Sequence, residues 1–497
     1  MICFLLPPAC CTADELAVSQ ARQKGPRCRL GEGAKRSPLT LDRLPQDVLH
    51  QILALLPMED AARTACVSRE LSQSWRYYPE LEFSAKTLAL GEEHTSIQGQ
   101  MATDIIKRID DVLRNRAGVW VKRLKFELLF FQKVPFHCVN HWLDAATPRI
   151  EELTLKVPQD DKTKYTFPCE LFSDENGFSI QSLCLSICAF HPVQGSCSFG
   201  SLKRVNFSWV RITTKESMLF LSNSLALEHL ELSYCHEIAC LRIPCTLQLF
   251  NYLWVRRCSM LQAIESDAPN LSSFHYEGPL IRFSFGHALQ LKDINISIYP
   301  WFDLFLYARL ELLRVAPNLE TLFLMSADEI DGLYGTILIP PDEKFLHLKY
   351  LELTIVGPRT ERYHFKFSSL VTFLDASPML ETFILHVEES AVAKTHLSID
   401  PSKITVFRRH CHQNIKHVKI TGFCPIQELV ELIFCILENA VLLQCLTLDY
   451  RIHDFGKVLV ARIAQDTGTR DYQEWWNNYG GMGALKEHHV SLVQQRI

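Results

Sequence analysis

The chain has 497 residues, of which 47% are hydrophobic, and it carries a formal net charge of −5. This length fits two to four domains or one long repeat array, and the charge argues against nonspecific nucleic-acid binding, which needs a basic surface. The 18 cysteines are spread along the chain, many within apolar runs, so they predict free thiols in a reducing compartment, cytoplasmic or nuclear. No run reaches the 18 apolar residues of a membrane span, and we expect no membrane partner.

Residues 1–37 differ in character from the rest of the chain. The first eleven are apolar but lack the basic residues that open a secretory signal, and residues 12–37 are polar and basic with few aliphatic side chains. We therefore expect a disordered leader over 1–37.

Residues 38–84 have a helical pattern. Apolar residues from Leu44 to Leu56 fall on one helical face, with Pro45 suited to a first turn and Pro57 ending the helix. A second helix is expected from Glu59 to about Leu71, and a short third one around 75–78. Three short helices bury little apolar area, so we expect a partner to cover their apolar face. A helical linker is expected to follow over 85–117.

From residue 118 to 450 the chain repeats the pattern apolar-x-x-apolar-x-apolar. Thirteen copies start 20 to 35 residues apart, which is the range of leucine-rich repeats. They begin at Val121, Ile150, Ile180, Leu202, Leu227, Phe250, Leu271, Leu291, Leu319, Leu348, Leu380, Ile415 and Leu443. In three copies a cysteine follows the last apolar position by three residues (Cys188, Cys235 and Cys258), where the repeat requires Asn or Cys.

The predicted fold is therefore α/β: a short N-terminal three-helix module followed by a curved leucine-rich repeat solenoid. The repeat strands are expected to form a parallel concave sheet, and helices such as 303–315 and 426–439 are expected on the convex side. Residues 451–497 are expected to form a C-terminal cap or tail, with Trp475 and Trp476 sealing the last repeat.

Side chains between the apolar strand positions point out of the concave sheet and are the candidates for ligand contact. Aromatic and arginine residues among them are favoured anchors of protein interfaces. The candidates are Trp254, Arg256, His275, Glu277, Phe323, Met325, Glu352 and Thr354.

The sequence has no glycine loop for phosphates, no G-x-S-x-G and no H-E-x-x-H motif, so we expect no catalytic residue, no cofactor and no metal. Two groups of histidines and cysteines lack the spacing of zinc sites. They comprise His410, Cys411, His412, His417 and Cys424 in one case, and Cys235, His236, Cys240 and Cys245 in the other.

Residues 41–84 resemble an F-box. The matching features are Leu44-Pro45, Val48-Leu49, Ile52-Leu53, Leu56-Pro57, Asp60-Ala61, Arg63-Thr64, Val67-Ser68-Arg69, Trp75 and Pro79-x-Leu81-x-Phe83. With the repeats, and with residues 419–449 similar to an FBD-type end, the chain resembles plant F-box/leucine-rich repeat proteins over residues 41 to about 450.

This resemblance implies a non-catalytic adaptor subunit of an SCF ubiquitin ligase. The F-box would dock on the Skp adaptor, which is attached to a cullin, and the repeats would hold an unknown protein client for ubiquitination. The residues that would face the Skp adaptor are Leu44, Pro45, Val48, Leu49, Ile52, Leu53, Val67, Ser68 and Trp75. The family usually has a further Arg-Trp pair where this chain has residues 69–73 (Arg-Glu-Leu-Ser-Gln), a departure that weakens the expected grip on the adaptor.

Two alternatives stay open at the level of the sequence. The chain is an interaction scaffold with a vestigial F-box, or a small molecule in the concave surface gates client binding. The second ranks lower, because no arginine cluster for an anion lies there. The identity of the client does not follow from the sequence.

Overall fold

The computed structural model describes residues 44–88, 98–116, 121–129, 134–146, 150–158, 164–172, 180–193, 199–286, 289–299, 304–326, 344–356, 367–388, 412–423, 427–452 and 455–462. The predicted leader at 1–37, the tryptophan pair at 475–476, and His410, Cys411 and Cys424 lie outside these residues. The chain divides into two compact units, residues 1–238 and 239–497.

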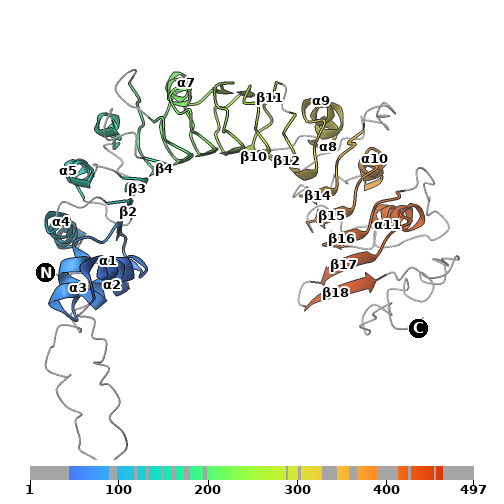
Figure 1. Cartoon of the computed structure of the whole chain (residues 1–497). Helices are drawn as coiled ribbons and strands as arrows, with labels where there is room; N and C mark the ends of the chain where they lie inside the picture. The colour runs from blue at the N-terminus through green and yellow to red at the C-terminus, as the bar shows by residue number, and fades with distance from the viewer. Residues whose placement is uncertain are drawn as a thin grey trace, which may run out of the picture. The chain divides into compact units, whose positions relative to one another are not determined.

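The first unit begins with three short helices, α1 (Gln46–Ala54), α2 (Met58–Ala65) and α3 (Arg69–Trp75) (Figure 1). The second and third helices differ from the prediction. The hydroxyl of Ser68 accepts a hydrogen bond from the Leu71 N–H at 3.2 Å, and Ser68 itself has extended backbone angles. This N-cap starts a new helix where a continuous one was expected, because the cap satisfies a backbone donor that a helix start leaves free.

A parallel sheet follows in the first unit. Its strands pair in sequence order, from β1 to β6. They are β1 (Glu80–Phe83), β2 (Arg123–Glu127), β3 (Glu152–Lys156), β4 (Ser182–Ser186), β5 (Arg204–Ser208) and β6 (His229–Ser233). The connections carry α4 (Gln98–Arg114), α5 (Phe136–Ala146), the 3₁₀ helix η4 (Cys169–Phe172) and α7 (Thr214–Ser222). These helices lie on one side of the sheet and leave its other face open (Figure 1).

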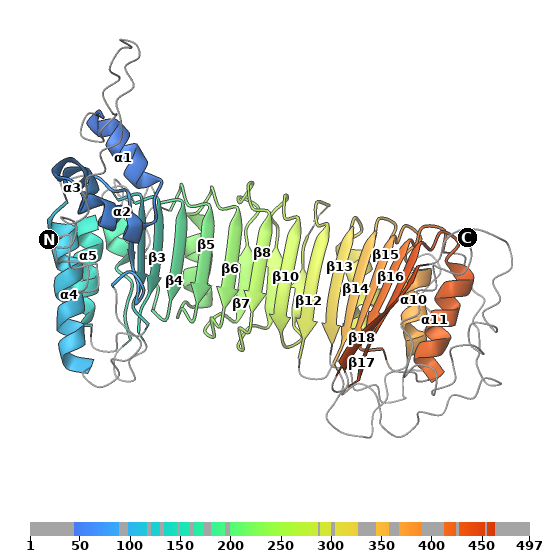
Figure 2. The same ribbon diagram turned by 90° about the horizontal axis from the view of Figure 1, so that it is seen from below.

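The second unit continues the repeat pattern. Its main strands also pair in parallel, one repeat to the next, and stand side by side in Figure 2. They are β8 (Tyr252–Arg256), β10 (Ser273–Gly278), β12 (Asp293–Ile298), β13 (Thr321–Ser326), β14 (Tyr350–Ile355), β15 (Thr382–Val387), β16 (His417–Thr421) and β17 (Cys445–Ile452). A final strand, β18 (Phe455–Arg462), pairs antiparallel with β17, within the region predicted as a cap or tail.

Each of the thirteen predicted copies contains a strand of these sheets, and its three apolar positions are buried, as in Leu227, Leu230 and Leu232. The structure adds β1, which the pattern search did not count. Stacked Phe83 of β1, Phe126 of β2 and Trp142 of α5 join this strand to the core, with ring centroids 5.2 and 5.6 Å apart.

Helices were predicted on the convex side between several of the strands, and the shortest repeats have strands there instead. Between residues 239 and 286 the connections form a second parallel sheet of β7 (Cys240–Ile243), β9 (Ala263–Ser266) and β11 (Arg282–Ser284). Repeats here are only 20 to 23 residues long. Extended backbone covers about 3.3 Å per residue against about 1.5 Å in a helix, so a short connection spans the repeat only as a strand.

In the longer repeats after residue 291, the connections between strands again contain helices. The predicted helix at 303–315 is found as α8 (Leu304–Tyr307), a π-helical turn η5 (Ala308–Leu312) and α9 (Leu313–Val315), and the one at 426–439 as α11 (Gln427–Asn439). The 3₁₀ helix η6 (Phe367–Leu370) and α10 (Val371–Asp375) precede β15. None of the helices that the structure describes has the length and apolar character to cross a membrane.

The three aligned cysteines are buried, as the repeat pattern predicts. The Cys235 thiol donates to the carbonyls of Phe207 and Ser233 at 3.7 and 3.6 Å, and that of Cys258 to the carbonyl of Arg256 at 3.5 Å. Burial raises the pKa of Cys188 to about 12. These thiols therefore act as small core side chains that also satisfy backbone carbonyls at the strand end.

Candidate protein-binding surfaces

The helical module at 44–78 separates the predicted adaptor contacts into two groups. Leu49, Leu53 and Trp75 are buried in the module's own core, where they stabilise the fold and offer no surface. The others remain at least partly accessible: Leu44, Pro45, Val48, Ile52, Val67 and Ser68. The side chain of Ser68 is already engaged in capping α3.

The most exposed apolar side chains of the module are Leu55 and Val67, at 85% and 75% exposure. Both follow a helix, Leu55 after α1 and Val67 after α2. Resemblance named Val67 but missed Leu55, which the predicted helical face of residues 44–56 did not single out. Exposed apolar side chains mark an interaction site where they gather in one patch, so these two residues are candidates for contact with a partner.

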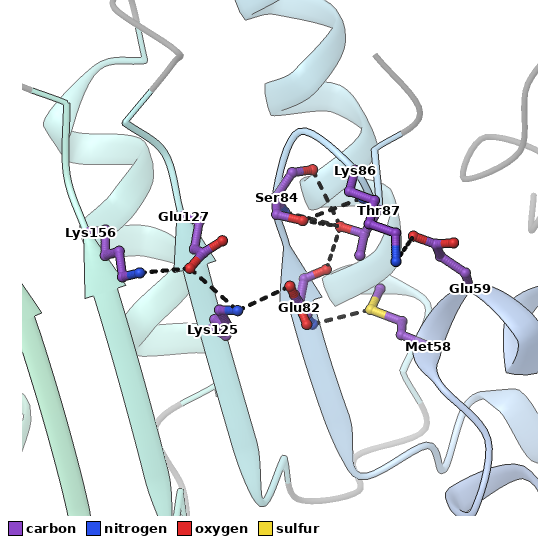
Figure 3. Close-up of polar contacts among 9 residues, drawn as sticks. All are labelled: Met58, Glu59, Glu82, Ser84, Lys86, Thr87, Lys125, Glu127 and Lys156. Carbon is purple, nitrogen blue, oxygen red and sulfur yellow. Dashed lines mark hydrogen bonds and ion pairs between the residues drawn. The ribbon is translucent and has the colours of Figure 1, made fainter. Parts of the chain in front are cut away.

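The module is tied to the first strand by specific contacts. The Tyr78 hydroxyl donates to the Leu56 carbonyl at 2.7 Å, and burial, with Glu80 nearby, raises the pKa of Tyr78 to about 12. The Met58 sulfur accepts the Glu82 N–H at 3.1 Å (Figure 3). Just beyond β1, the Thr87 hydroxyl donates to the Glu82 carbonyl at 2.7 Å. The helices are therefore held directly against the strand that opens the sheet.

The outward-pointing side chains of the repeat strands form what we call the strand face, which corresponds to the predicted concave side. On β1, β2 and β3 this face carries a ladder of alternating charge (Figure 3). Lys125 lies 3.1 Å from Glu82 and 3.3 Å from Glu127, and Glu127 lies 2.8 Å from Lys156. The bond from Lys156 holds the pKa of Glu127 below its ordinary value. These charges pair with one another.

In the second unit the eight predicted contact residues form two rows across the strands. Registered pairing places Trp254 beside His275 in one row and Arg256 beside Glu277 in the next. Further along, Phe323 lies beside Glu352 and Met325 beside Thr354. The structure therefore brings the eight together on one face, in two adjacent rows.

Strand β12 fills the gap in both rows with residues that sequence reasoning missed. Asn295 lies between His275 and Phe323, and Ser297 between Glu277 and Met325. The same pattern position, between apolar residues, could have found them. They were passed over because small polar side chains carry no interface preference of their own.

Some predicted contacts are partly engaged within the chain. Glu277 accepts hydrogen bonds from Arg256 and Arg257, at 2.5 and 2.7 Å. The His275 ring lies 3.0 Å from the Asp293 carboxylate and packs against Tyr252. The apolar members of the set are Trp254 and Phe323 in one row and Met325 in the next.

Glu352, which was predicted as an outward-pointing candidate for ligand contact, is only 9% exposed. Its carboxylate accepts the Tyr350 hydroxyl at 2.5 Å and lies 2.8 Å from His386 Nε2. Burial and this bond raise the pKa of Tyr350 to about 12. Glu352 therefore organises its neighbours. His386, which is registered with Thr354 in the adjacent row, was missed because its contact with Glu352 spans two strands.

The described residues include no group of three or more His, Cys, Asp or Glu placed to hold a metal ion. Within the first cysteine–histidine group, His412 is buried and its N–H donates to the Asn439 carbonyl at 2.8 Å. Cys235 of the second group is buried in the core, while Cys245 is exposed.

Comparison with known proteins identifies both parts of the chain. The model of the At1g61320/AtMIF1 leucine-rich repeat domain matches residues 112–469, and the F-box domain model matches residues 41–82. The chain belongs to this leucine-rich repeat family. It is an F-box/leucine-rich repeat chain, as the resemblance in its sequence indicated.

Similar proteins include two from Arabidopsis thaliana. The F-box/FBD/LRR-repeat protein At1g13570 is 24% identical over 53% of this chain and 55% of its own length. The F-box/LRR-repeat protein At3g03360 is 23% identical over 77% of this chain and 80% of its own. The F-box/leucine-rich repeat chain thus spans about half the length of the first of these relatives. Among solved structures, the yeast Rad7 and Elc1 complex matches at 13% identity over 70% of this chain and 91% of that one, with a TM-score of 0.29, too weak a likeness to argue from.

Proposed function

We propose that this chain is the substrate-recruiting F-box subunit of an SCF-type ubiquitin ligase. The F-box docks on the Skp adaptor, which is attached to a cullin, and the strand face of the repeats binds a protein client. One observation carries the proposal: the module that matches the F-box model exposes the apolar side chains of Leu55 and Val67 and is bonded to strand β1 through Met58 and Glu82. The module therefore offers apolar side chains to a partner while it is attached to the sheet.

The proposed mechanism is proximity. A chain of this kind makes and breaks no bond, and it raises the effective concentration of the client near the enzyme that transfers ubiquitin. Short contacts between the helical module and β1 support this, because a fixed attachment limits the positions that a client on the first repeats can take.

The adaptor contacts we propose are the accessible members of the predicted set, with Leu55 added. Substituting a charge at an exposed apolar contact removes buried area and places an unpaired charge in the interface. Leu49, Leu53 and Trp75 act indirectly, because their burial holds α1 and α3 in place.

The client contacts we propose are the two rows of the second unit, with Trp254, Phe323 and Met325 as anchors. Aromatic and methionine side chains are enriched in protein interfaces. The arginine and carboxylate pairs beside them contribute more to the orientation of the client than to its affinity. Charges that already have partners within the chain gain little further attraction from the client.

The test is a titration of the purified full chain with a purified Skp adaptor. The Val67→Asp and Leu55→Asp variants are expected to bind the adaptor at least about tenfold more weakly. Val193→Asp is the matched control, since Val193 is 61% exposed and lies after β4, outside the helical module. A Leu44/Pro45 double-alanine variant probes the start of α1.

Equal adaptor binding by wild type and all three module variants would contradict the proposal. The scaffold alternative, with a vestigial F-box, predicts that wild type itself fails to bind the adaptor. It also predicts that a captured client keeps the same lifetime in cells when the chain is removed.

A further inference from the structure

Three consecutive repeats of the first unit end their strands on a residue with positive φ. Ile187 follows β4 with φ 59°, Trp209 follows β5 with 57°, and Tyr234 follows β6 with 55°. The next residue of each repeat, Cys188, Val210 or Cys235, is buried. The left-handed conformation turns the chain so that the side chain of the next residue points into the core.

The identity of these left-handed residues is unusual. Glycine or asparagine adopts this conformation at little cost, whereas a β-branched or bulky residue there is an outlier. This chain has isoleucine, tryptophan and tyrosine at the three positions, and Trp209 is 51% exposed. Arg257 has the same conformation at the same place of the next repeat, with φ 51°, so the turn belongs to the repeat and needs no particular side chain. The large side chains at the three turns of the first unit therefore point to a use outside the fold.

These side chains form an ordered surface, which we call the aromatic shelf and which comprises Ile187, Trp209, Tyr234 and His236. The rings of Trp209 and Tyr234 stack with centroids 4.4 Å apart and planes 4° apart. The His236 ring stands edge-on to both. Ile187 and Trp209 are fixed in line by backbone hydrogen bonds to the carbonyls of Ser208 and Ser233, at 3.0 and 2.8 Å.

The last outward position of each strand is a serine, and Ser186, Ser208 and Ser233 are registered neighbours. The charged side chains beside this row are paired: Lys156, in register with Ser186, lies 2.8 Å from Glu127, and Glu231 accepts a hydrogen bond from Asn206. Two further pairs involve residues beyond the strand ends. Arg211 lies 2.5 Å from Glu237, and His191 lies 2.6 Å from Glu216.

We propose that the aromatic shelf is a docking site for an uncharged, extended segment of the protein client. An aliphatic or prolyl side chain of that segment packs on Trp209, and its backbone groups form hydrogen bonds with Ser208 and Ser233, since Ser186 is only 9% exposed. A charged segment would lose hydration there without gaining a counter-ion, so it is disfavoured. The inference rests on the proposed function, and it places part of the client contact on the first unit, near the F-box end of the chain.

The experiment selects binders from a displayed library of random twelve-residue peptides on the immobilised full chain. Enriched peptides are then titrated in solution against wild type and variants. We expect peptides with no net charge and an aliphatic or prolyl centre, and Trp209→Asn is expected to bind them at least about tenfold more weakly. Leu225→Asn is the control, because Leu225 is 55% exposed in the turn before β6, away from the shelf.

Asparagine is chosen because it tolerates the left-handed conformation. Thermal unfolding of Trp209→Asn is therefore expected to match wild type, and Ile187→Asn serves as a second variant if the ring stack proves necessary for folding. Adaptor binding, measured on the same samples, is expected to be unchanged.

Three outcomes would each overturn the shelf proposal: no enrichment of peptides, enrichment of charged peptides, or equal binding by both shelf variants and wild type. The F-box proposal fails in a different way, namely if the wild-type chain does not bind the adaptor. The two proposals are therefore tested separately.

Discussion

The strand face has two different characters in two regions of the chain. On β1–β3 it carries the ladder from Glu82 to Lys156, in which each charge has an opposite neighbour. On β8–β14 the equivalent positions hold Trp254, Phe323 and Met325. Parallel register places the same repeat position of each strand side by side. The residue type at that position therefore decides whether neighbouring side chains pair with one another or remain accessible to a partner.

This difference separates a region of the repeat array that is stabilised by its own side chains from a region that can contact another molecule. Opposite charges in register stabilise the first strands, where the helical module is attached, and they offer little to a client. The aromatic side chains and Met325 of the second region stand among polar residues, and their apolar area gains favourable contacts only when another molecule covers it.

The largest effect is expected from breaking the aromatic region. The background is a full chain that carries Val67→Asp to block adaptor docking. In this chain, the Trp254→Ala, Phe323→Ala double variant should label its client at least about tenfold less. The measurement is proximity labelling with quantitative mass spectrometry, compared with the same chain without the two substitutions.

Lys125→Met in the same background is the matched control on the charged region, and it should label the same proteins as its parent. Equal labelling by the double variant would place the client contact elsewhere on the chain.

A smaller effect, on stability, is expected at Glu352. Alanine there removes the acceptor of the Tyr350 hydroxyl and the partner of His386 in a site that is nearly buried. Leaving such groups without partners costs about 1–3 kcal/mol, so the free energy of unfolding in urea should fall by that amount. Glu352→Gln, which keeps an acceptor oxygen, should lose less, and a loss equal to that of alanine would argue against the hydrogen bonds as the cause.

The smallest effect is expected from the charged ladder. Its side chains are partly exposed, so Lys125→Met should lower the free energy of unfolding by under about 1 kcal/mol at neutral pH. Because the pKa of Glu127 is lowered in the fold, the ladder contributes fully above the ordinary glutamate pKa and is lost as pH falls through the lowered one.

The difference between wild type and Lys125→Met should therefore shrink below about pH 4 and also in high salt. Chemical unfolding at several pH values and salt concentrations measures this. A difference that stays constant under both changes would assign the effect to packing of the lysine stem.

Sequence alone was sufficient for the repeats and for most of the F-box. Every predicted copy contains a strand, because burying two alternate apolar residues on one face is a local requirement that recurs in each repeat. The cysteine positions followed from the same regularity. The strand face also followed, since its residues are those that the apolar pattern leaves pointing outward.

Features that depend on contacts between repeats did not follow. The small sheet of β7, β9 and β11 replaces helices because neighbouring repeats are short enough for their connections to pair. The burial of Glu352 depends on His386, which lies 34 residues away. The exposure of Leu55 depends on how the three helices pack.

The sequence by itself thus determined the family, the order of the parts and which residues form the strand face that we propose for the client. Only the tertiary structure decided which residues on that face are already paired, which F-box residues belong to the core, and that Trp209 and Tyr234 stack at the ends of their strands. The physical reason is that the apolar pattern acts within one repeat, whereas pairing, burial and stacking depend on side chains from neighbouring repeats that register brings together.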